Sequence, residues 1–200
     1  MDFELKWQGH TLNLHRKTLV MGVLNVTPDS FSDGGLFLDP GRAVEHGLEM
    51  ARDGAHIIDV GGESTRPYAE KLSSTEEIDR VIPVIQALTR ELSIPISIDT
   101  TKSQVAMEAM DAGASIINDI SALHFDPEMG AFAAKAEVPI ILMHMKGNPE
   151  NMQDNPVYDD VVGEVLDFLK HSMDRYVALG IRKDLIVVDP GIGFGKTFSH

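Results

Sequence analysis

The chain has 200 residues, 43% of them apolar, and a formal net charge of −14 at pH 7. This composition supports one substantial hydrophobic core, and no Gly/Ser-rich linker or charge block divides the chain, so we expect a single domain over residues 1–200. The acidic balance argues against a nucleic-acid partner, because a phosphate backbone requires a basic protein face. A small anionic ligand is compatible with it if local cations, helix N-termini or a metal hold that ligand.

Cysteine is absent, which excludes a disulfide framework, a thiolate metal site and a cysteine nucleophile. The N-terminal residues lack the basic start and apolar stretch of a secretion signal. No apolar run approaches the roughly 18 residues that a membrane span requires. We therefore expect a soluble, cytoplasmic protein with no membrane partner.

The first predicted elements are a hairpin and then a repeating strand–helix pattern. Residues 3–16 alternate around Gln8-Gly9-His10, which predicts a β-hairpin that covers one end of the main fold. After it, runs of Val, Ile and Leu alternate with segments of helical periodicity. The expected strands are 18–27, 56–61, 95–100, 115–120, 139–144 and 185–190.

The segment after Ser74 is the clearest helix. Ser74 and Glu77 have the S-x-x-E spacing of a capping box, and apolar residues then recur three and four positions apart at Ile78, Ile82, Ile85 and Leu88. Three expected helices end, just before a strand, on a glycine that can adopt the left-handed conformation: Gly54, Gly113 and Gly180. The unit that repeats along the chain is therefore a strand followed by a helix.

Each predicted strand stops on a polar side chain. A short run of Val, Ile and Leu is typical of a strand buried on both faces, and its C-terminal end lies where parallel α/β folds place their ligands. The residues at these ends are Asn25, Asp59, Asp99, Asn118, Asp119, His144 and Asp189. Six buried strands thus deliver polar groups to one place, and we expect the function to depend on those groups.

The strand ends also indicate the size of the fold. From Asn25 to Asp189 the repeat averages about 33 residues, which is typical of a βα unit. A (β/α)8 TIM barrel needs roughly 260 residues, whereas this chain holds only about six units. Polar groups at every strand end fit a ring better than an open sheet, whose ligands gather at one switch point. We therefore predict an α/β TIM barrel with an N-terminal hairpin, incomplete at its C-terminus, and expect the natural protein to be longer.

Two loops that follow strands have the composition of ligand-binding loops. The first, residues 25–35, is rich in turn formers with Phe31 as its only large apolar residue, which favours a lid over a solvated turn. In the second, residues 61–67, Arg66 beside hydroxyl groups suits an anionic oxygen cluster such as phosphate. The alternative is an Arg66 that only pairs with Glu63.

The loop after the last predicted strand, residues 189–197, suggests two nucleotide-binding motifs, and both fail on spacing. A P-loop needs a glycine where the chain has Pro190, and a dinucleotide loop needs one at Lys196. We expect its glycines instead to let the backbone bend over the barrel mouth and present Phe194.

Asp99, Asn118 and Asp189 form the centre of the expected site. Carboxylates and an amide that converge in an apolar barrel mouth can bind a flat heterocycle, because the acids accept from amino and ring N–H groups while the amide donates and accepts. Each could singly be a helix cap or a satisfied core group, but their repetition across strands favours a binding site. For Asp59 and Asp119 we favour a structural role. We also expect His144 to be structural, because no second histidine lies at the spacing of a metal ligand.

Six motifs occur in a fixed order: NVTPDSFSDGG, DVGGESTRP, SIDTTK, IINDIS, MHMKG and DPGIGFGKT. From Thr18 to the end, the chain resembles the dihydropteroate synthase family, and its first two motifs are highly specific. The resemblance implies a (β/α)8 barrel, usually a homodimer, that acts as a transferase in folate biosynthesis and is the target of sulfonamides. In that reaction, 4-aminobenzoate displaces diphosphate from 6-hydroxymethyl-7,8-dihydropterin diphosphate and gives 7,8-dihydropteroate.

The resemblance also implies roles for individual residues. The pterin would be held by Asp99, Asn118 and Asp189, the diphosphate by Thr65 and Arg66, and its Mg²⁺ by Asn25. The aminobenzoate pocket would include Phe31, Pro67 and Phe194. The resemblance leaves open whether Asp29 or Asp33 reaches the metal. The family also has a lysine on a seventh strand and an Arg-x-His site on an eighth, and neither lies within these 200 residues.

The implied reaction fits the charges of these residues. Loss of diphosphate develops positive charge on the pterin, which acidic groups favour, while Mg²⁺ and Arg66 stabilise the leaving group. An aryl amine is already nucleophilic, so no strong base is required. We expect catalysis to depend on Asn25, Arg66, Asp99 and Asp189.

Two alternatives predict other motifs. A pterin-binding methyltransferase domain, which passes a methyl group from a methyl-folate to a corrinoid, has no use for the TPDSFSDGG and STRP loops, and both loops are intact. A non-catalytic pterin-binding paralogue should lose loop residues such as Arg66 or Asn25 first, and both are present. Diphosphate release that depends on 4-aminobenzoate and Mg²⁺ distinguishes these possibilities.

Overall fold

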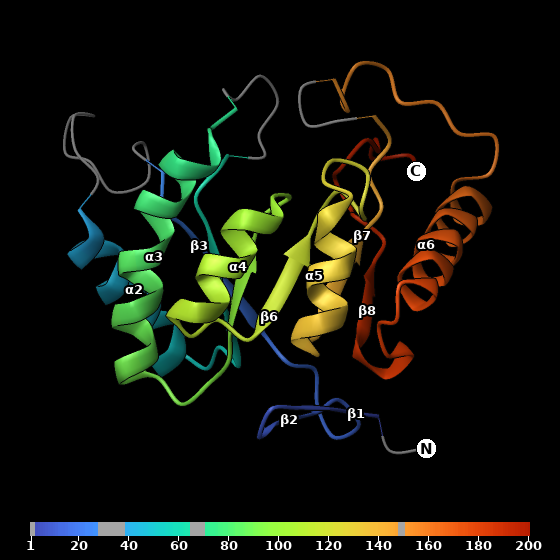
Figure 1. Ribbon diagram of the computed structural model, residues 1–200. Coiled ribbons are helices and arrows are strands. Elements are labelled where there is room, and N and C mark those ends of the chain that lie inside the picture. The colour runs from blue at the N-terminus through green and yellow to red at the C-terminus, as the bar shows by residue number, and fades with distance from the viewer. Residues whose placement is uncertain (1–2, 28–38, 65–70, 148–150) are drawn as a thin grey trace.

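The computed structural model describes residues 3–27, 39–64, 71–147 and 151–200. Within these ranges, six parallel strands form one sheet in sequence order, and helices cover one face of it (Figure 1). The strands are β3 (Met21–Asn25), β4 (Ile57–Gly61), β5 (Ile96–Asp99), β6 (Ile116–Asp119), β7 (Ile140–Met143) and β8 (Ile186–Asp189). The helices are α2 (Pro40–Arg52), α3 (Ser74–Glu91), α4 (Ser103–Ala112), α5 (Glu128–Ala136) and α6 (Val161–Ala178), with a 3-10 turn η1 at Lys183–Leu185.

The predicted α/β fold class is confirmed, because the sheet and its helices form part of a (β/α) barrel. Neighbouring strands follow one another in the chain and run parallel, which is the arrangement of a barrel wall. Each predicted strand contains one observed strand. The observed strands are shorter because the apolar runs extend past the residues that pair with a neighbour.

The sheet register separates an apolar row of side chains from a polar row. The apolar row aligns Leu24, Val60, Ile98, Ile117 and Ile140 across β3 to β7, and all five are fully buried. Since successive residues of a strand point to opposite faces, this row packs against the helices and the next row faces away from them. Burying each side chain stabilises the fold by about 1.5–3 kcal/mol. The apolar row therefore fixes the register of the polar one.

The predicted N-terminal hairpin is confirmed and covers one end of the sheet. Its strands are β1 (Glu4–Trp7) and β2 (His10–Asn13), joined by Gln8 and Gly9, which both have positive φ. Leu5, Trp7 and Leu12 are buried in the main core, and Gln8 Nε2 donates to the Ala136 carbonyl at 2.8 Å. The hairpin lies opposite the C-terminal ends of the strands (Figure 1), so the end where ligands are expected is left open.

The capping box of α3 differs from the prediction by one residue. Ser73, not Ser74, is the N-cap: its Oγ accepts from Glu76 N at 3.2 Å, and its own N–H donates to Glu76 Oε2 at 3.0 Å. The sequence Ser73-Ser74-Thr75-Glu76-Glu77 contains the S-x-x-E spacing twice, and burial decides between them because Glu77 is only 1% exposed. Of the predicted apolar face, the structure buries Ile85 and Leu88 fully and Ile78 and Ile82 partly.

The three predicted helix-ending glycines are confirmed in the left-handed conformation. Gly54, Gly113 and Gly180 have φ values of 109°, 112° and 98°. At Gly113 a Cβ atom would also lie 2.6 Å from the Thr89 side chain. Each glycine lets the chain leave a helix. Two residues separate each of the first two glycines from the next strand, whereas η1 lies between Gly180 and β8.

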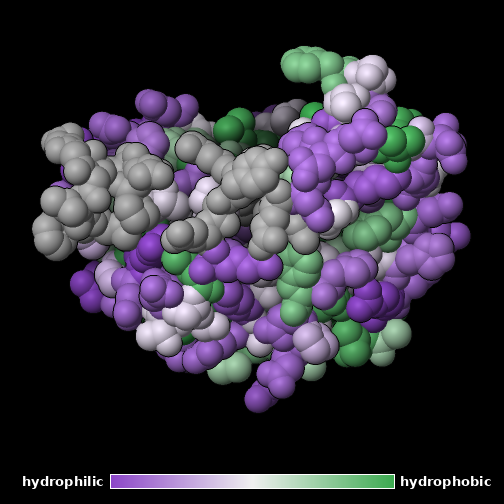
Figure 2. Space-filling view, turned by 90° about the horizontal axis from the view of Figure 1, so that it is seen from above, coloured by the Kyte–Doolittle hydropathy of each residue, from purple (hydrophilic) through white to green (hydrophobic). Residues whose placement is uncertain are grey.

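The described surface at the open end is mainly hydrophilic. Figure 2 looks onto this end, where polar side chains predominate and apolar ones are scattered among them. In the part of the chain that the structure describes, no helix combines the length and the apolar character needed to cross a membrane.

Candidate active site

The polar row of the sheet brings together most of the described strand-end residues that the sequence singled out. Asn25 pairs with Gly61, Gly61 with Asp99, and Asp99 with Asn118 across β3 to β6. Paired residues of parallel strands face the same side, so these side chains share the face turned away from the helices. On β7 the row continues with Ile141, which pairs with Asn118. Asp189 pairs with Met143, two residues further along β7, and therefore lies on the same face.

Gly61 leaves a gap between the side chains of its two neighbours in the row. A Cβ atom on Gly61 would lie 3.4 Å from Asp99 Oδ2 and 3.7 Å from Asn25 Oδ1. An amide oxygen and a carboxylate oxygen therefore approach the same point without a side chain between them. This pair of oxygens can meet a cation or an N–H donor.

Asp59 precedes Gly61 by two residues on β4, so its side chain lies on the same face as the row, and it accepts a hydrogen bond from Asn118. Asp59 is 3% exposed, and its carboxylate accepts from Ser97 Oγ and, at 3.0 Å, from Asn118 Nδ2. Burial raises the pKa of Asp59, while the two hydrogen bonds oppose that rise. The bond to Asp59 fixes the plane of the Asn118 amide and sets which end of it a ligand meets.

Asp99 is surrounded by other acids. Burial raises the pKa of Asp99 well above its ordinary value, and the negative charges of Asp59 and Glu77 raise it further. Asp99 therefore keeps its proton to a higher pH than an exposed aspartate does. A ligand that donates N–H groups or carries positive charge would favour its ionised form.

Lys196 holds the glycine loop that follows β8. Its ammonium donates to the carbonyls of Gly191 at 2.9 Å and Phe194 at 3.1 Å, and it lies 2.9 Å from His144 Nδ1. Gly191 also donates its N–H to Asp189 Oδ1 at 2.7 Å. The lysine thus orders the loop from within rather than facing a phosphate, which agrees with the failure of the P-loop spacing.

His144, the residue directly after β7, lies beside this loop. It is 4% exposed, and burial followed by the positive charge of Lys196 lowers the pKa of His144 to about 4. Its ring packs edge-on against Phe168 of α6 at 4.8 Å between centroids. A neutral imidazole in these surroundings accepts the hydrogen bond from the Lys196 ammonium.

Phe194 packs on a small apolar cluster beside Asp189. The cluster contains Ile120, Met143, Met145 and Met152, and Phe194 is partly buried against it. The sequence predicted that this loop presents Phe194. The methionines against which Phe194 packs come from β7 and the connections after it.

Asp119 points away from the polar row, toward α6. It is fully buried and accepts hydrogen bonds from Ser121 N at 2.9 Å, Leu123 N at 2.9 Å and Tyr176 Oη at 2.9 Å. Burial and the charge of Asp119 raise the pKa of Tyr176. Asp119 therefore joins the β6 loop to a helix and does not face the candidate site.

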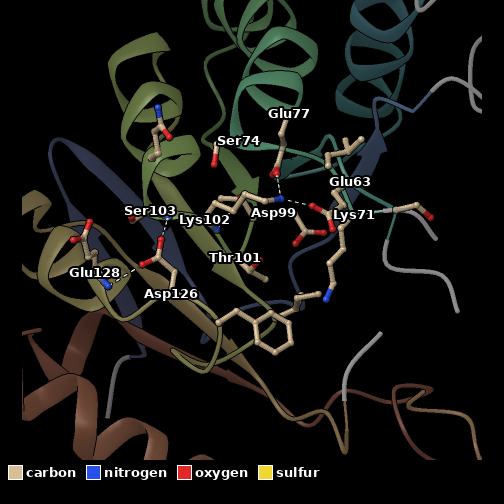
Figure 3. Close-up of a pocket in the computed structure, with 16 residues that line it drawn as sticks. Glu63, Lys71, Ser74, Glu77, Asp99, Thr101, Lys102, Ser103, Asp126 and Glu128 are labelled. Carbon is tan, nitrogen blue, oxygen red and sulfur yellow. Dashed lines mark hydrogen bonds and ion pairs between the residues drawn. The ribbon is translucent and has the colours of Figure 1, made fainter. Parts of the chain in front are cut away.

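A charged cluster that the sequence did not predict lies beside Asp99. A cavity of about 470 Å³ is lined by Asp99 together with Glu63, Glu77 and Lys102 (Figure 3). The ammonium of Lys102 forms ion pairs with both glutamates. The S-x-x-E spacing predicts a helix-capping role for Glu77, and no local spacing links Glu77 to Lys102, so only the folded chain brings the two together.

Several predicted site residues cannot be placed. They lie outside the described residues, and their roles stay predictions: Asp29, Phe31, Asp33, Thr65, Arg66 and Pro67.

The fold is part of a (β/α) barrel, and carboxylates and an amide lie at the open ends of its strands, as in enzymes that bind a flat heterocycle there. The chain belongs to the pterin binding enzyme family, whose profile matches residues 21–200. The resemblance noted in the motifs is therefore confirmed at the level of the family.

Curated relatives match nearly the whole chain. Dihydropteroate synthase from Synechocystis is 52% identical over 190 residues, which cover 94% of this chain and 66% of the relative. The enzyme from Bacillus subtilis is 53% identical over 187 residues, which cover 94% and 63%. The chain thus spans about two thirds of the length of these relatives.

Solved structures agree with this assignment. Yersinia pestis dihydropteroate synthase, in a complex with a sulfonamide drug, superposes with a TM-score of 0.91 at 48% identity and covers 98% of this chain and 71% of its own. The Xanthomonas albilineans enzyme with 4-aminobenzoic acid gives a TM-score of 0.90 at 45% identity and covers 100% and 70%.

Proposed function

We propose that the protein is a dihydropteroate synthase, which joins 6-hydroxymethyl-7,8-dihydropterin diphosphate to 4-aminobenzoate. The observation that carries the proposal is the polar row itself: Asn25, Asp99 and Asn118 share one face, with Asp189 beside them. Relatives that carry this name are about half identical to the chain. Both support the same reaction.

The acids would bind the pterin ring and then stabilise its charge. Asp99 and Asp189 would accept hydrogen bonds from ring and amino N–H groups, and Asn118 would add an amide held by Asp59. Because Asp99 has a raised pKa in the free protein, these N–H groups would draw it into its ionised form. The carboxylates then favour the positive charge that develops as diphosphate leaves.

Asn25 fits a Mg²⁺ ligand. Its Oδ1 faces the gap at Gly61, close to Asp99. Among the described residues, no three His, Cys, Asp or Glu side chains gather as a metal site, but Mg²⁺ is commonly held by one or two protein oxygens together with substrate phosphates and water. When bound, the ion would neutralise charge on the leaving diphosphate. Thr65 and Arg66 would assist on the same side.

The aminobenzoate would lie against Phe194, with Phe31 and Pro67 as further walls. Its amine nitrogen attacks the pterin methylene carbon as the bond from that carbon to the diphosphate oxygen breaks. The electron pair leaves with diphosphate, and the amine proton passes to water. The homodimer stays a prediction from the resemblance, and the cytoplasmic location stays a prediction from the composition.

Diphosphate release provides the test. We expect release from the pterin diphosphate only when 4-aminobenzoate and Mg²⁺ are both present, with equimolar formation of 7,8-dihydropteroate by mass spectrometry. Asp184→Asn is the matched control, because Asp184 is exposed on the 3-10 turn η1, where it pairs with Arg182. Release that does not depend on the amine would contradict the proposal.

A further inference from the structure

Lys102 lies among acids at the edge of the candidate site, in a cavity wall that also includes Lys71. It is the N-cap residue of α4, three positions after Asp99. Its ammonium lies between the carboxylates of Glu63 and Glu77 and is paired with both (Figure 3). The Lys102 side chain is 22% exposed and that of Glu77 is 1% exposed, so this contact is largely shielded from water.

The two glutamates come from different elements. Glu63 belongs to the loop that leaves β4 and continues into Thr65 and Arg66, whereas Glu77 projects from α3. The residue before Glu63 is also held on α3: the Gly62 carbonyl accepts from Arg80 Nη1 at 3.1 Å. A Cβ atom on Gly62 would lie 2.8 Å from Val81 Cγ1. Two consecutive residues at the start of the loop are thus fixed to the protein body by two cations.

The cluster also controls the charge that a substrate meets. Burial opposes the charge on Lys102, but the pairs with Glu63 and Glu77 outweigh it and raise the pKa of Lys102. The lysine is therefore protonated throughout the neutral range. Without it, the uncompensated charges of both glutamates would face a substrate that carries a negative diphosphate.

We propose that Lys102 is a positioning residue for the diphosphate half of the substrate. It fixes Glu63, and with it the start of the loop after β4, and it cancels the charge of two acids beside the site. This inference rests on the proposed function. Lys102 acts through Glu63 and does not touch the reacting atoms.

A purely structural role for Lys102 makes a different prediction. If Lys102 only neutralises the buried Glu77, replacing both with neutral residues should restore both the stability and the ligand affinity. If Lys102 positions the loop, the double variant Lys102→Met/Glu77→Gln should fold normally and still bind diphosphate poorly, because Glu63 has then lost its ion pair with Lys102.

Binding of two ligands separates these roles. The probes are 6-hydroxymethyl-7,8-dihydropterin diphosphate and the same pterin without its diphosphate, each titrated calorimetrically into the protein with Mg²⁺. In the double variant we expect affinity for the diphosphate to fall at least about tenfold, while affinity for the bare pterin changes less than about twofold. Lys102→Arg should recover most of the loss. Glu128→Gln, which removes an exposed acid from the same cavity wall, should alter neither.

Two outcomes would overturn this inference but not the proposed function. One is an equal loss of affinity for both ligands, and the other is no loss of affinity in the double variant. The measurement requires no turnover, so it can fail independently of the activity. A wild-type protein that binds neither pterin would instead overturn the proposed function, and the inference with it.

Discussion

Asn118 donates a hydrogen bond from Nδ2 to Oδ2 of Asp59 at 3.0 Å. The two side chains come from β6 and β4, and β5 lies between them and contributes the Ser97 hydroxyl to the same carboxylate. A buried acid on one strand therefore orients an amide on another strand, at the face of the candidate site. This makes Asp59 a positioning group, although it is itself almost inaccessible.

Asp59→Asn should weaken pterin binding by about tenfold. The replacement amide has one acceptor end and one donor end, so it cannot accept from both Ser97 and Asn118, and the Asn118 amide turns over. The fold should not lose stability at neutral pH, because burial raises the pKa of Asp59 and disfavours its charge. Calorimetry with 6-hydroxymethylpterin and thermal unfolding test this, with Asp184→Asn as control. Unchanged pterin affinity would argue against the positioning role.

Asp99→Asn should stabilise the protein while removing activity. The unfolded chain ionises Asp99 at its ordinary pKa, whereas burial and neighbouring acids raise the pKa of Asp99 in the fold. The folded state thus binds the proton more tightly, and the contribution of Asp99 to stability declines as pH rises between the two pKa values. We expect a higher Tm for the variant at about pH 8, little change at about pH 3, and a loss in kcat/KM of about 100-fold. A Tm gain confined to acid pH would contradict the assigned direction.

Lys102→Met should destabilise the fold by about 3 kcal/mol, because it leaves the carboxylate of Glu77 buried without a counter-ion. Lys102→Met/Glu77→Gln should recover most of this loss, since no buried charge is then left unpaired. Urea unfolding of both variants measures the difference as a shift in midpoint at constant slope. Equal destabilisation of the single and double variants would show that packing, and not charge, dominates.

Gly191→Ala and Gly193→Ala form a matched pair in the loop after β8. Both glycines have positive φ, at 65° and 88°, so alanine costs each about 1 kcal/mol in backbone strain. At Gly191, however, a Cβ would lie 2.0 Å from the His144 carbonyl oxygen, whereas at Gly193 nothing lies within 4 Å. Only Gly191→Ala must displace the loop, so it should lower kcat/KM by more than about tenfold. Similar kinetics for the two variants would contradict the assigned contact.

Much of the fold could be predicted because local sequence and tertiary structure agree. The strands are short and rich in Val, Ile and Leu, with a polar residue at or near the end of each. Three of the helices end where a glycine turns the chain. The strand-end pattern alone predicts that Asp99 and Asn118 lie close together. In the sheet they are direct neighbours in one row.

Contacts between distant parts of the chain could not be predicted from local patterns. The predicted capping box, Ser74 with Glu77, is wrong by one residue because the S-x-x-E spacing occurs twice in this segment. Only the burial of Glu77 decides between the two. The partner of that glutamate, Lys102, follows a different strand. Such ion pairs depend on how strands and helices assemble, which spacing along the chain does not report.

Lys196→Met should raise the pKa of His144, which is about 4 in the folded protein. Burial is the larger cause of this low value and the positive charge of Lys196 the next, so removing the charge should move the pKa upward but leave it below the ordinary 6.5. The His144 ring proton, followed by NMR from about pH 3 to pH 8, reports the shift directly and without turnover.

The same variant alters stability in acid. In the wild type, the unfolded state binds a proton on His144 at a higher pH than the folded state does. His144 therefore contributes less stability as the pH falls below its ordinary pKa of 6.5. In Lys196→Met this decline should be shallower. Lys183→Met, which removes an exposed lysine at the far end of β8, should leave the pKa of His144 unchanged. An unshifted His144 in Lys196→Met would show that burial alone sets its pKa and that the ammonium orders the loop only through the carbonyls.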